Sequence, residues 1–257
     1  SPGVLKKDEL ALGIFYIDYG SFYEADETGK ILGNFTAREY AFHISYARPI
    51  DSFFTVGINL KPVLSQLEKY QSFGLLSDIG FTYHSETQLL TVACVLKNIG
   101  YQLSSYDGKN HEPVPFEIQL GLTKKLAHAP FRFTFLVHDL ETYDLRYEKE
   151  DDIQTDFFGV EQETTMLNKF TDNVLRHLNV GFEFVPLESF YAALSMNFQR
   201  RMELMIESRP WVSGISWGFG LKIKRIQFGY AYSYYHLAGS TGHLSLNINL
   251  DFLNKYI

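Results

Sequence analysis

Apolar and polar side chains alternate along most of this chain with a period of two. In segment 54–61 one set of alternate positions holds Phe54, Val56, Ile58 and Leu60, and the other holds Thr55, Gly57, Asn59 and Lys61. Segments 116–123, 190–199 and 244–252 repeat the pattern. Because successive side chains of a β-strand point to opposite faces, this period predicts strands with one apolar and one polar face. Over the whole chain it predicts about twelve strands.

The connections between the predicted strands are alternately short and long. The short ones lie at 48–51, 84–87, 128–130, 186–189 and 222–225, and the long ones at 26–30, 70–73, 106–114, 149–173, 207–212 and 237–242. Short connections are typical of β-hairpins, so consecutive strands should be antiparallel neighbours, with the short turns at one end and the long loops at the other. Within the longest loop, Met166, Leu167 and Phe170 fall on one face of a predicted short helix.

The polar face distinguishes a membrane barrel from a soluble β-sandwich, because both folds give the same alternation. A soluble sheet carries charged residues throughout its solvent face. Here that face holds mainly small residues and amides with single charges between them, and large aromatics gather on the apolar face. Such rings favour lipid and its interfaces. No uncharged apolar run reaches the ~18 residues of a membrane-spanning helix, so a membrane crossing would use strands.

We therefore expect an all-β fold, a transmembrane antiparallel up-and-down β-barrel formed by residues 1–257 as a single domain. Short turns would lie on the periplasmic side, and the insertion at about 149–173 would be extracellular. A soluble β-sandwich is the alternative. The residues predicted to line the lumen are Asn59, Lys61, Glu117, Gln119, Arg132, Asn179, Glu183 and Asn197.

Charge separates the two ends of the predicted sheet. The formal net charge is −7 and there is no dense Lys/Arg tract, which argues against a nucleic-acid partner. Basic residues lie at several short turns, and acidic residues concentrate in the long loops. The loop residues expected to contact a partner are Asp151, Asp152, Phe157, Phe158 and Glu161. Packing of the two phenylalanines against the barrel rim is the alternative reading.

Signals for catalysis or metal binding are weak. Gly214–Gly218 matches the Gly-x-Ser-x-Gly pattern of serine hydrolases, but Ser216 falls within an alternating strand and no helix follows it. The eight histidines show no ligand spacing, and the single cysteine, Cys94, has no second cysteine for a zinc site or an intrachain disulfide. The sequence therefore predicts no enzyme activity, no metal and no cofactor.

A further signal is distributed over almost the entire chain. It lies in the segments Tyr16–Phe22, Asp26–Gly29, Gly57–Lys61, Lys97–Gly100, Pro115–Leu122, Asp172–His177 and Asn197–Leu204. In this order the segments resemble the PorQ branch of the PorV and FadL-like outer-membrane barrels, found in the type IX secretion system of Bacteroidetes. The resemblance implies a FadL-like barrel, normally of fourteen strands with an N-terminal region that enters or closes the lumen. Ser1–Leu5 resembles the Asn-Pro-Ala-Leu-Leu segment of such proteins, which precedes two further strands, so we expect missing sequence before Lys6.

The resemblance also implies a function and a location. Proteins of this branch are not enzymes; they sit in the outer membrane of Gram-negative bacteria and anchor the cell-surface attachment complex. Their expected partners are outer-membrane lipid and lipopolysaccharide, a PorZ-like surface protein, and the PorV component and PorU sortase of that complex. The alternative is a FadL-like transporter that passes a hydrophobic small molecule.

Overall fold

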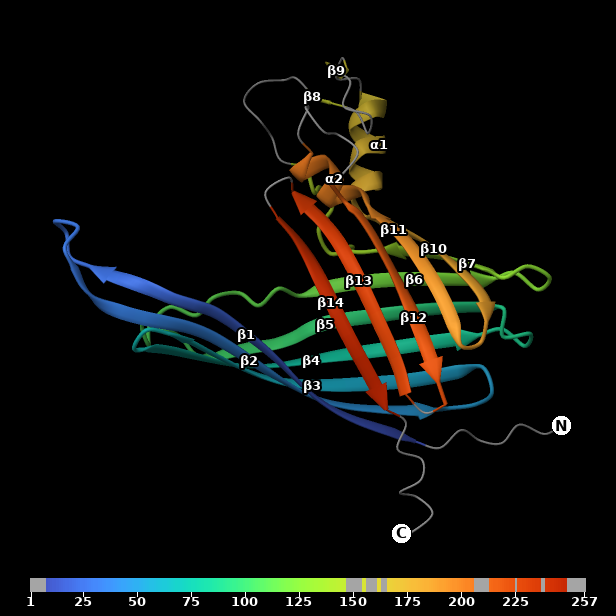
Figure 1. The fold of residues 1–257 in the computed structure, drawn as a ribbon, viewed down its shortest axis with the longest axis horizontal. Coiled ribbons are helices and arrows are strands. Elements are labelled where there is room, and N and C mark those ends of the chain that lie inside the picture. Colours follow the sequence, from blue (N-terminus) through green and yellow to red (C-terminus); the bar gives the residue numbers. More distant parts are fainter. Residues whose placement is uncertain are drawn as a thin grey trace, which may run out of the picture. The chain divides into compact units, whose positions relative to one another are not determined.

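A computed structural model describes residues 8–146, 154–155, 161–162, 166–205, 213–224, 226–236 and 239–248. Twelve antiparallel strands form one sheet whose order follows the chain, in the order β1 to β7 and then β10 to β14 (Figure 1). The strands are β1 (Glu9–Ala25), β2 (Ile31–Pro49), β3 (Phe54–Leu67), β4 (Tyr70–His84), β5 (Leu90–Ser104), β6 (Glu117–Lys125), β7 (Phe131–Val137), β10 (Leu178–Leu187), β11 (Phe190–Asn197), β12 (Ile215–Ile223), β13 (Ile226–His236) and β14 (Gly239–Ile248). The number and antiparallel order predicted from the alternation are thus confirmed. Among the described residues no pairing between β1 and β14 is detected, so the barrel closure is not shown.

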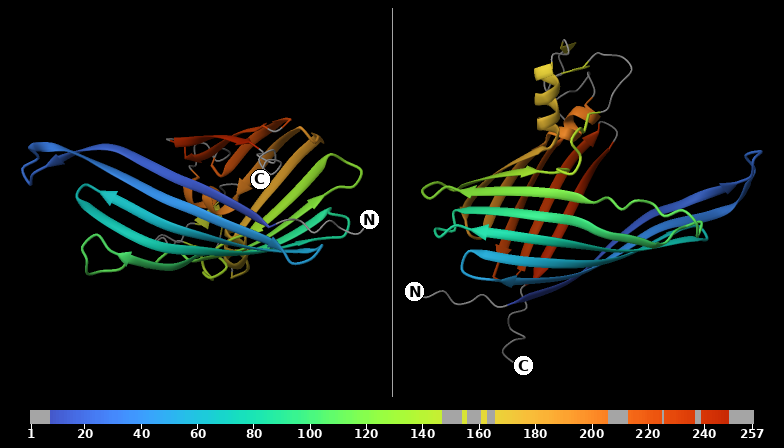
Figure 2. Two further views of the ribbon diagram at one scale, coloured as in Figure 1. Left: turned by 90° about the horizontal axis from the view of Figure 1, so that it is seen from below. Right: turned by 180° about the vertical axis from the view of Figure 1, so that it is seen from behind.

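The contacts of the chain divide it into two units, and each is described by itself. The first comprises residues 1–84 and 93–119, and the second comprises residues 85–92 and 120–257. In the first unit, β1 and β2 pair along nearly their whole lengths, whereas β2 and β3 pair only from Ala37↔Leu67 to Pro49↔Thr55. Both views of Figure 2 show the hairpin of β1 and β2 continuing beyond the end of its neighbour.

The second unit contains β7, β10–β14 and two helices, α1 (Met166–Arg176) and α2 (Phe198–Leu204). A separate two-stranded sheet pairs β8 (Gln154–Thr155) with β9 (Glu161–Gln162). Aromatic rings stack across neighbouring strands, as where the centroids of Phe131 and Phe182 lie 5.3 Å apart. Such cross-strand ring pairs stabilise the register of an antiparallel sheet.

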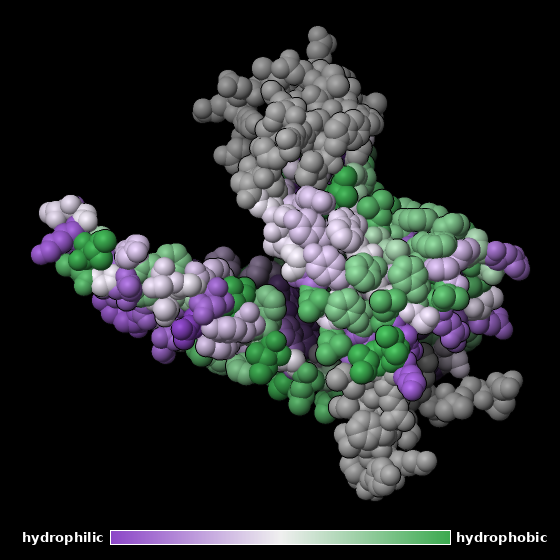
Figure 3. Space-filling view, in the orientation of Figure 1, coloured by the Kyte–Doolittle hydropathy of each residue, from purple (hydrophilic) through white to green (hydrophobic). Residues whose placement is uncertain are grey.

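Burial is inverted relative to a water-soluble protein. Among the described residues the buried side chains are mainly polar: Lys61, Ser72, Gln102, Ser105, His138, Asn173, His177, Arg201 and Ser213. Large apolar side chains are exposed instead, and Leu244 keeps 72% of its surface accessible. Figure 3 shows apolar surface over β12–β14. The helices of the described residues are all too short or too polar to cross a membrane.

Several boundaries differ from the sequence prediction. The connection expected at 70–73 is a two-residue turn at 68–69, and Tyr70 begins β4, because Glu68 adopts a positive φ of 56° without glycine. The connection expected at 237–242 ends earlier, since β14 begins at Gly239. The strand expected over 190–199 ends at Asn197, whose side chain caps α2 by accepting a hydrogen bond from the Arg200 amide at 2.6 Å.

The helix predicted from Met166, Leu167 and Phe170 is confirmed as α1. The last predicted strand is confirmed as β14 up to Ile248, and its remaining residues lie outside the described part of the chain.

Candidate functional site

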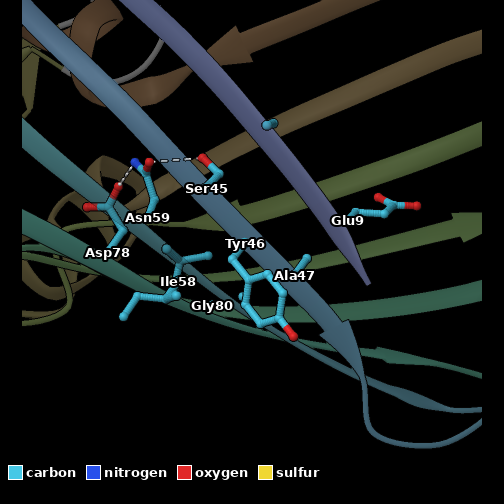
Figure 4. A pocket seen from close by; sticks show the side chains of 11 residues that line it. Glu9, Ser45, Tyr46, Ala47, Ile58, Asn59, Asp78 and Gly80 are labelled. Atoms are coloured by element: carbon cyan, nitrogen blue, oxygen red, sulfur yellow. Dashed lines mark hydrogen bonds between the residues drawn. The ribbon is translucent and has the colours of Figure 1, made fainter. Parts of the chain in front are cut away.

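The polar face of β2–β4 carries a hydrogen-bonded network centred on Asn59. Its amide oxygen accepts a hydrogen bond from Ser45 Oγ at 2.9 Å, and its amide nitrogen donates to Asp78 Oδ2 at 2.9 Å. The same nitrogen lies 3.1 Å from His43 Nδ1. Figure 4 shows Ser45, Asn59 and Asp78 pointing toward one another from three neighbouring strands. The predicted residue Asn59 thus joins three strands of the first unit.

Lys61 extends this network into a buried ion pair. Its Nζ lies 2.6 Å from Asp78 Oδ1 and 2.5 Å from Asn98 Oδ1, and the side chain is only 8% exposed. The backbone amide of Asn98 donates a second hydrogen bond to Asp78, at 2.8 Å. Asn98 has a positive φ of 58°, and a Cβ on nearby Gly100 would lie 2.1 Å from the carbonyl oxygen of Leu75. This irregularity lets β5 approach β4 closely and turns the Asn98 amide toward the carboxylate.

Glu117 and Gln119 belong to a second polar group of the first unit. Lys97 Nζ lies 2.7 Å from Glu117 Oε2, and Gln119 Nε2 donates to Glu117 Oε1 at 2.5 Å. Both oxygens of this carboxylate therefore have polar partners.

The remaining predicted lumen residues lie in the second unit. Arg132 and Glu183 are register partners on β7 and β10 and form an ion pair with an N–O distance of 3.3 Å. Asn179 and Asn197 face each other across β10 and β11. The Oδ1 of Asn179 is buried and has no hydrogen-bond partner in the part of the chain that the structure describes. These contacts are all formed within the second unit.

A hollow of about 290 Å³ lies on the polar face of the first unit. Its lining consists of Glu9, Ala11, Ser45, Tyr46, Ala47, Gly57, Ile58, Asn59, Asp78, Gly80 and Val95. Two carboxylates border the hollow, but that of Asp78 is already engaged by Lys61.

The long-connection end of the second unit is a hydrogen-bonded cap built from segment 138–146, α1 and α2. The two ring nitrogens of His177 lie 2.8 Å from the carbonyl oxygen of Asn173 and 2.9 Å from that of Thr142. The Asn173 side chain donates to the Tyr143 carbonyl at 2.6 Å and accepts from the Leu145 amide at 3.0 Å. These bonds hold the 142–145 segment along α1 and satisfy backbone groups outside the sheet ladder.

Two further contacts fix the cap. Hydrogen bonds from Arg146 lower the pKa of the Asp144 carboxyl to about 2. Arg201 of α2 is 1% exposed, and Gly214 packs against it with a φ of +83°. A Cβ at Gly214 would lie 2.5 Å from the Asn197 carbonyl oxygen and 2.9 Å from the Arg201 Cβ, so only glycine fits this position.

Most of the predicted partner-binding residues lie outside the part of the chain that the structure describes. Asp151, Asp152, Phe157 and Phe158 lie outside the described residues, and Glu161 is placed only as a backbone position of β9, paired with Thr155. Ser216 lies within β12, which continues to Ile223, so it does not occupy the strand-to-helix turn of a hydrolase elbow.

The sequence analysis missed Asp78 and Asn98, which complete the environment of Lys61. A signal for Asp78 was present, because it is the one charged residue of the mainly apolar run 75–81 and such a group needs a partner when it is buried. The sequence signal for Asn98 was weaker, because its role depends on the local irregularity of β5.

Taken together, the polar faces are cross-linked by ion pairs and amides. The arrangement can hold strands in register and present polar groups to water or a plug. No family model matches this chain, and no curated protein is significantly similar to it.

Proposed function

We propose that this protein is a non-enzymatic outer-membrane component of a type IX secretion and cell-surface attachment complex. In this proposal it spans the outer membrane of a Gram-negative bacterium as a FadL-like barrel. Its long-connection end anchors a PorZ-like surface protein near the PorV component and the PorU sortase. The resemblance of the sequence to the PorQ branch supplies the identity of the partners.

The observation that carries the proposal is the inverted burial of the two sheet faces. Leu60 is 40% exposed while its neighbour Lys61 is 8% exposed, and Leu103 is 55% exposed beside Gln102 at 8%. In water an exposed apolar surface of this extent would drive aggregation, whereas lipid solvates it. A membrane-spanning barrel also satisfies its backbone groups internally, as an antiparallel sheet of consecutive hairpins does once it closes.

The polar interior favours an anchor over a transporter of hydrophobic molecules. The face that would line the lumen carries the Lys61–Asp78 and Lys97–Glu117 ion pairs. A hydrophobic substrate would have to displace water from these charges, which is costly. The ordered cap of the second unit, in contrast, gives the loop that precedes α1 a fixed base.

The proposal predicts that the purified protein needs detergent or lipid to remain monomeric. In detergent or in liposomes it should retain the PorZ-like protein in a pull-down, and deletion of residues 150–169 should weaken that retention. Unchanged retention would remove this loop from the proposal. Solubility without detergent would overturn the membrane location, and rapid, specific uptake of fatty acid by liposomes containing the protein would favour the transporter.

A further inference from the structure

The hairpin of β1 and β2 extends beyond the sheet of the first unit as a two-stranded ribbon, which we define as residues 21–36. Its register runs from Ser21↔Thr36 to Ala25↔Ile31. The pairing of β2 with β3 begins only at Ala37. Just before it, the Glu68 amide of the β3–β4 turn donates a 3.1 Å hydrogen bond to the Thr36 carbonyl. Within the described residues, the β3-side edge of β2 over residues 31–35 therefore has no neighbouring strand (Figure 2).

The ribbon is a built element and not a frayed end. A β-bulge at Gly20, with φ +85°, separates it from the rest of β1, and the Asp18 carboxylate accepts a 2.8 Å hydrogen bond from the Gly20 amide. At the tip, Asp26 Oδ1 accepts hydrogen bonds from the Thr28 hydroxyl at 2.6 Å and the Lys30 amide at 3.0 Å. The hydrogen bond from the Thr28 side chain is the main cause that lowers the pKa of Asp26.

The ribbon lies beyond the part of β1 that a membrane span requires. Residues 9–18 pair with 38–47, and a tilted membrane strand needs about 9–11 residues. The ribbon shares its end of the unit with the 68–69 turn and the 105–116 loop, since all three follow odd-numbered strands. In the proposed function this is the extracellular end, so lipid does not cover the ribbon.

The ribbon nevertheless exposes large apolar side chains on both faces. Phe22 and Phe35 stack with ring centroids 5.3 Å apart on one face, while Tyr23 on the other face is 74% exposed. Leu32 is 61% exposed. A two-stranded hairpin is marginally stable in water by itself, and an apolar ribbon with an unpaired edge is the usual template for an added strand.

We propose that the β2 edge over residues 31–35 is the docking edge for a surface protein, which adds a β-strand of apolar and basic residues to it. This inference rests on the proposed function and names the element that holds the partner. The outer edge of β1 is a different case, because a neighbouring wall strand would pair with it in a closed barrel.

Charge on the ribbon selects the class of occupant. It carries three carboxylates, Glu24, Asp26 and Glu27, against one lysine, Lys30. A second copy of this chain would bring the same carboxylates to the contact, and anionic lipid or lipopolysaccharide would be repelled by them. A basic strand from a protein is attracted, and its alternate apolar side chains can cover the exposed rings.

The test compares Leu32→Lys with Ile50→Lys in the full chain in detergent. Ile50 is a matched control, because it is 65% exposed but lies at the short-turn end of the same unit. Binding of the PorZ-like protein should weaken by about fivefold or more in Leu32→Lys and stay unchanged in Ile50→Lys. Tyr23→Ser is a milder change in the ribbon and should also weaken binding. It serves as the test variant if Leu32→Lys misfolds.

Hydrogen exchange gives a second readout, in which the amides of 31–35 should gain protection when the partner is added. Equal binding by both lysine variants without such protection would overturn the docking edge while leaving the anchor function standing. Protection that rises with protein concentration alone would assign the edge to a second copy and overturn the proposal. Failure of the unmodified protein to bind would instead overturn the proposed function.

Discussion

Replacement of Lys61 by methionine tests whether buried polar contacts stabilise the sheet. Methionine keeps the length of the side chain but leaves the Asp78 carboxylate without its cation, although Asn59 and the Asn98 amide still donate to it. Breaking a buried ion pair costs about 3–5 kcal/mol, and the two remaining donors place the expected loss near the lower limit, about 3 kcal/mol. The free energy of unfolding from urea titrations in detergent micelles or lipid measures this loss.

A double variant separates the ion pair from the packing of the lysine stem. Lys61→Met combined with Asp78→Asn removes both charges, so its loss should be smaller than that of Lys61→Met alone. Lys69→Met is the control, because the Lys69–Glu68 pair is exposed and exposed pairs contribute about 1 kcal/mol or less. The reasoning would be refuted if Lys61→Met and Lys69→Met lowered the free energy of unfolding equally. It would also be refuted if the double variant were less stable than both single variants.

Three further predictions concern the second unit. Leu194→Arg, on the exposed apolar face, should destabilise the protein by about 2–4 kcal/mol in lipid, whereas an effect within about 0.5 kcal/mol would indicate a water-facing surface. Gly214→Ala should lower the free energy of unfolding by about 1–3 kcal/mol more than Gly29→Ala, which has the same φ of +83° but open space around it. Equal losses would contradict the packing argument. Asp144 should titrate near pH 2 in a carboxyl NMR titration, because a lowered folded-state pKa means that its pairing with Arg146 is lost only as the pH falls from about 4 toward 2; a normal pKa would contradict it.

Strand number, order and most turns followed from the sequence because they depend on local alternation. The period of two places each side chain on a face without knowledge of its neighbours. The same reasoning found α1, whose apolar positions recur at helical spacing. It failed at residues 198–199, where alternation continued by chance into α2 and the Asn197 cap was the only contrary signal.

The partners of the predicted polar residues depended on register, and register depended on one turn. With the β3–β4 turn at 70–73, Asn59 would have stood opposite His84. The actual turn at 68–69 places it opposite Asp78. Because Glu68 takes a left-handed backbone conformation that favours glycine or asparagine, sequence patterns gave no indication of this turn. Lys61 was therefore predicted on the polar face, but its partners Asp78 and Asn98 were not.

The inverted burial also explains where a function can reside in such a sheet. In the proposed membrane location, lipid would solvate apolar side chains as well as a protein interior does, so the outer face would contribute little to the choice of register. The register would then be set by the backbone hydrogen bonds and by polar clusters such as Lys61 with Asp78. The inner face would therefore have a structural role. The ends of the strands are under neither constraint. The ribbon of residues 21–36 and the cap around His177 both lie at strand ends, and both are held by local hydrogen bonds.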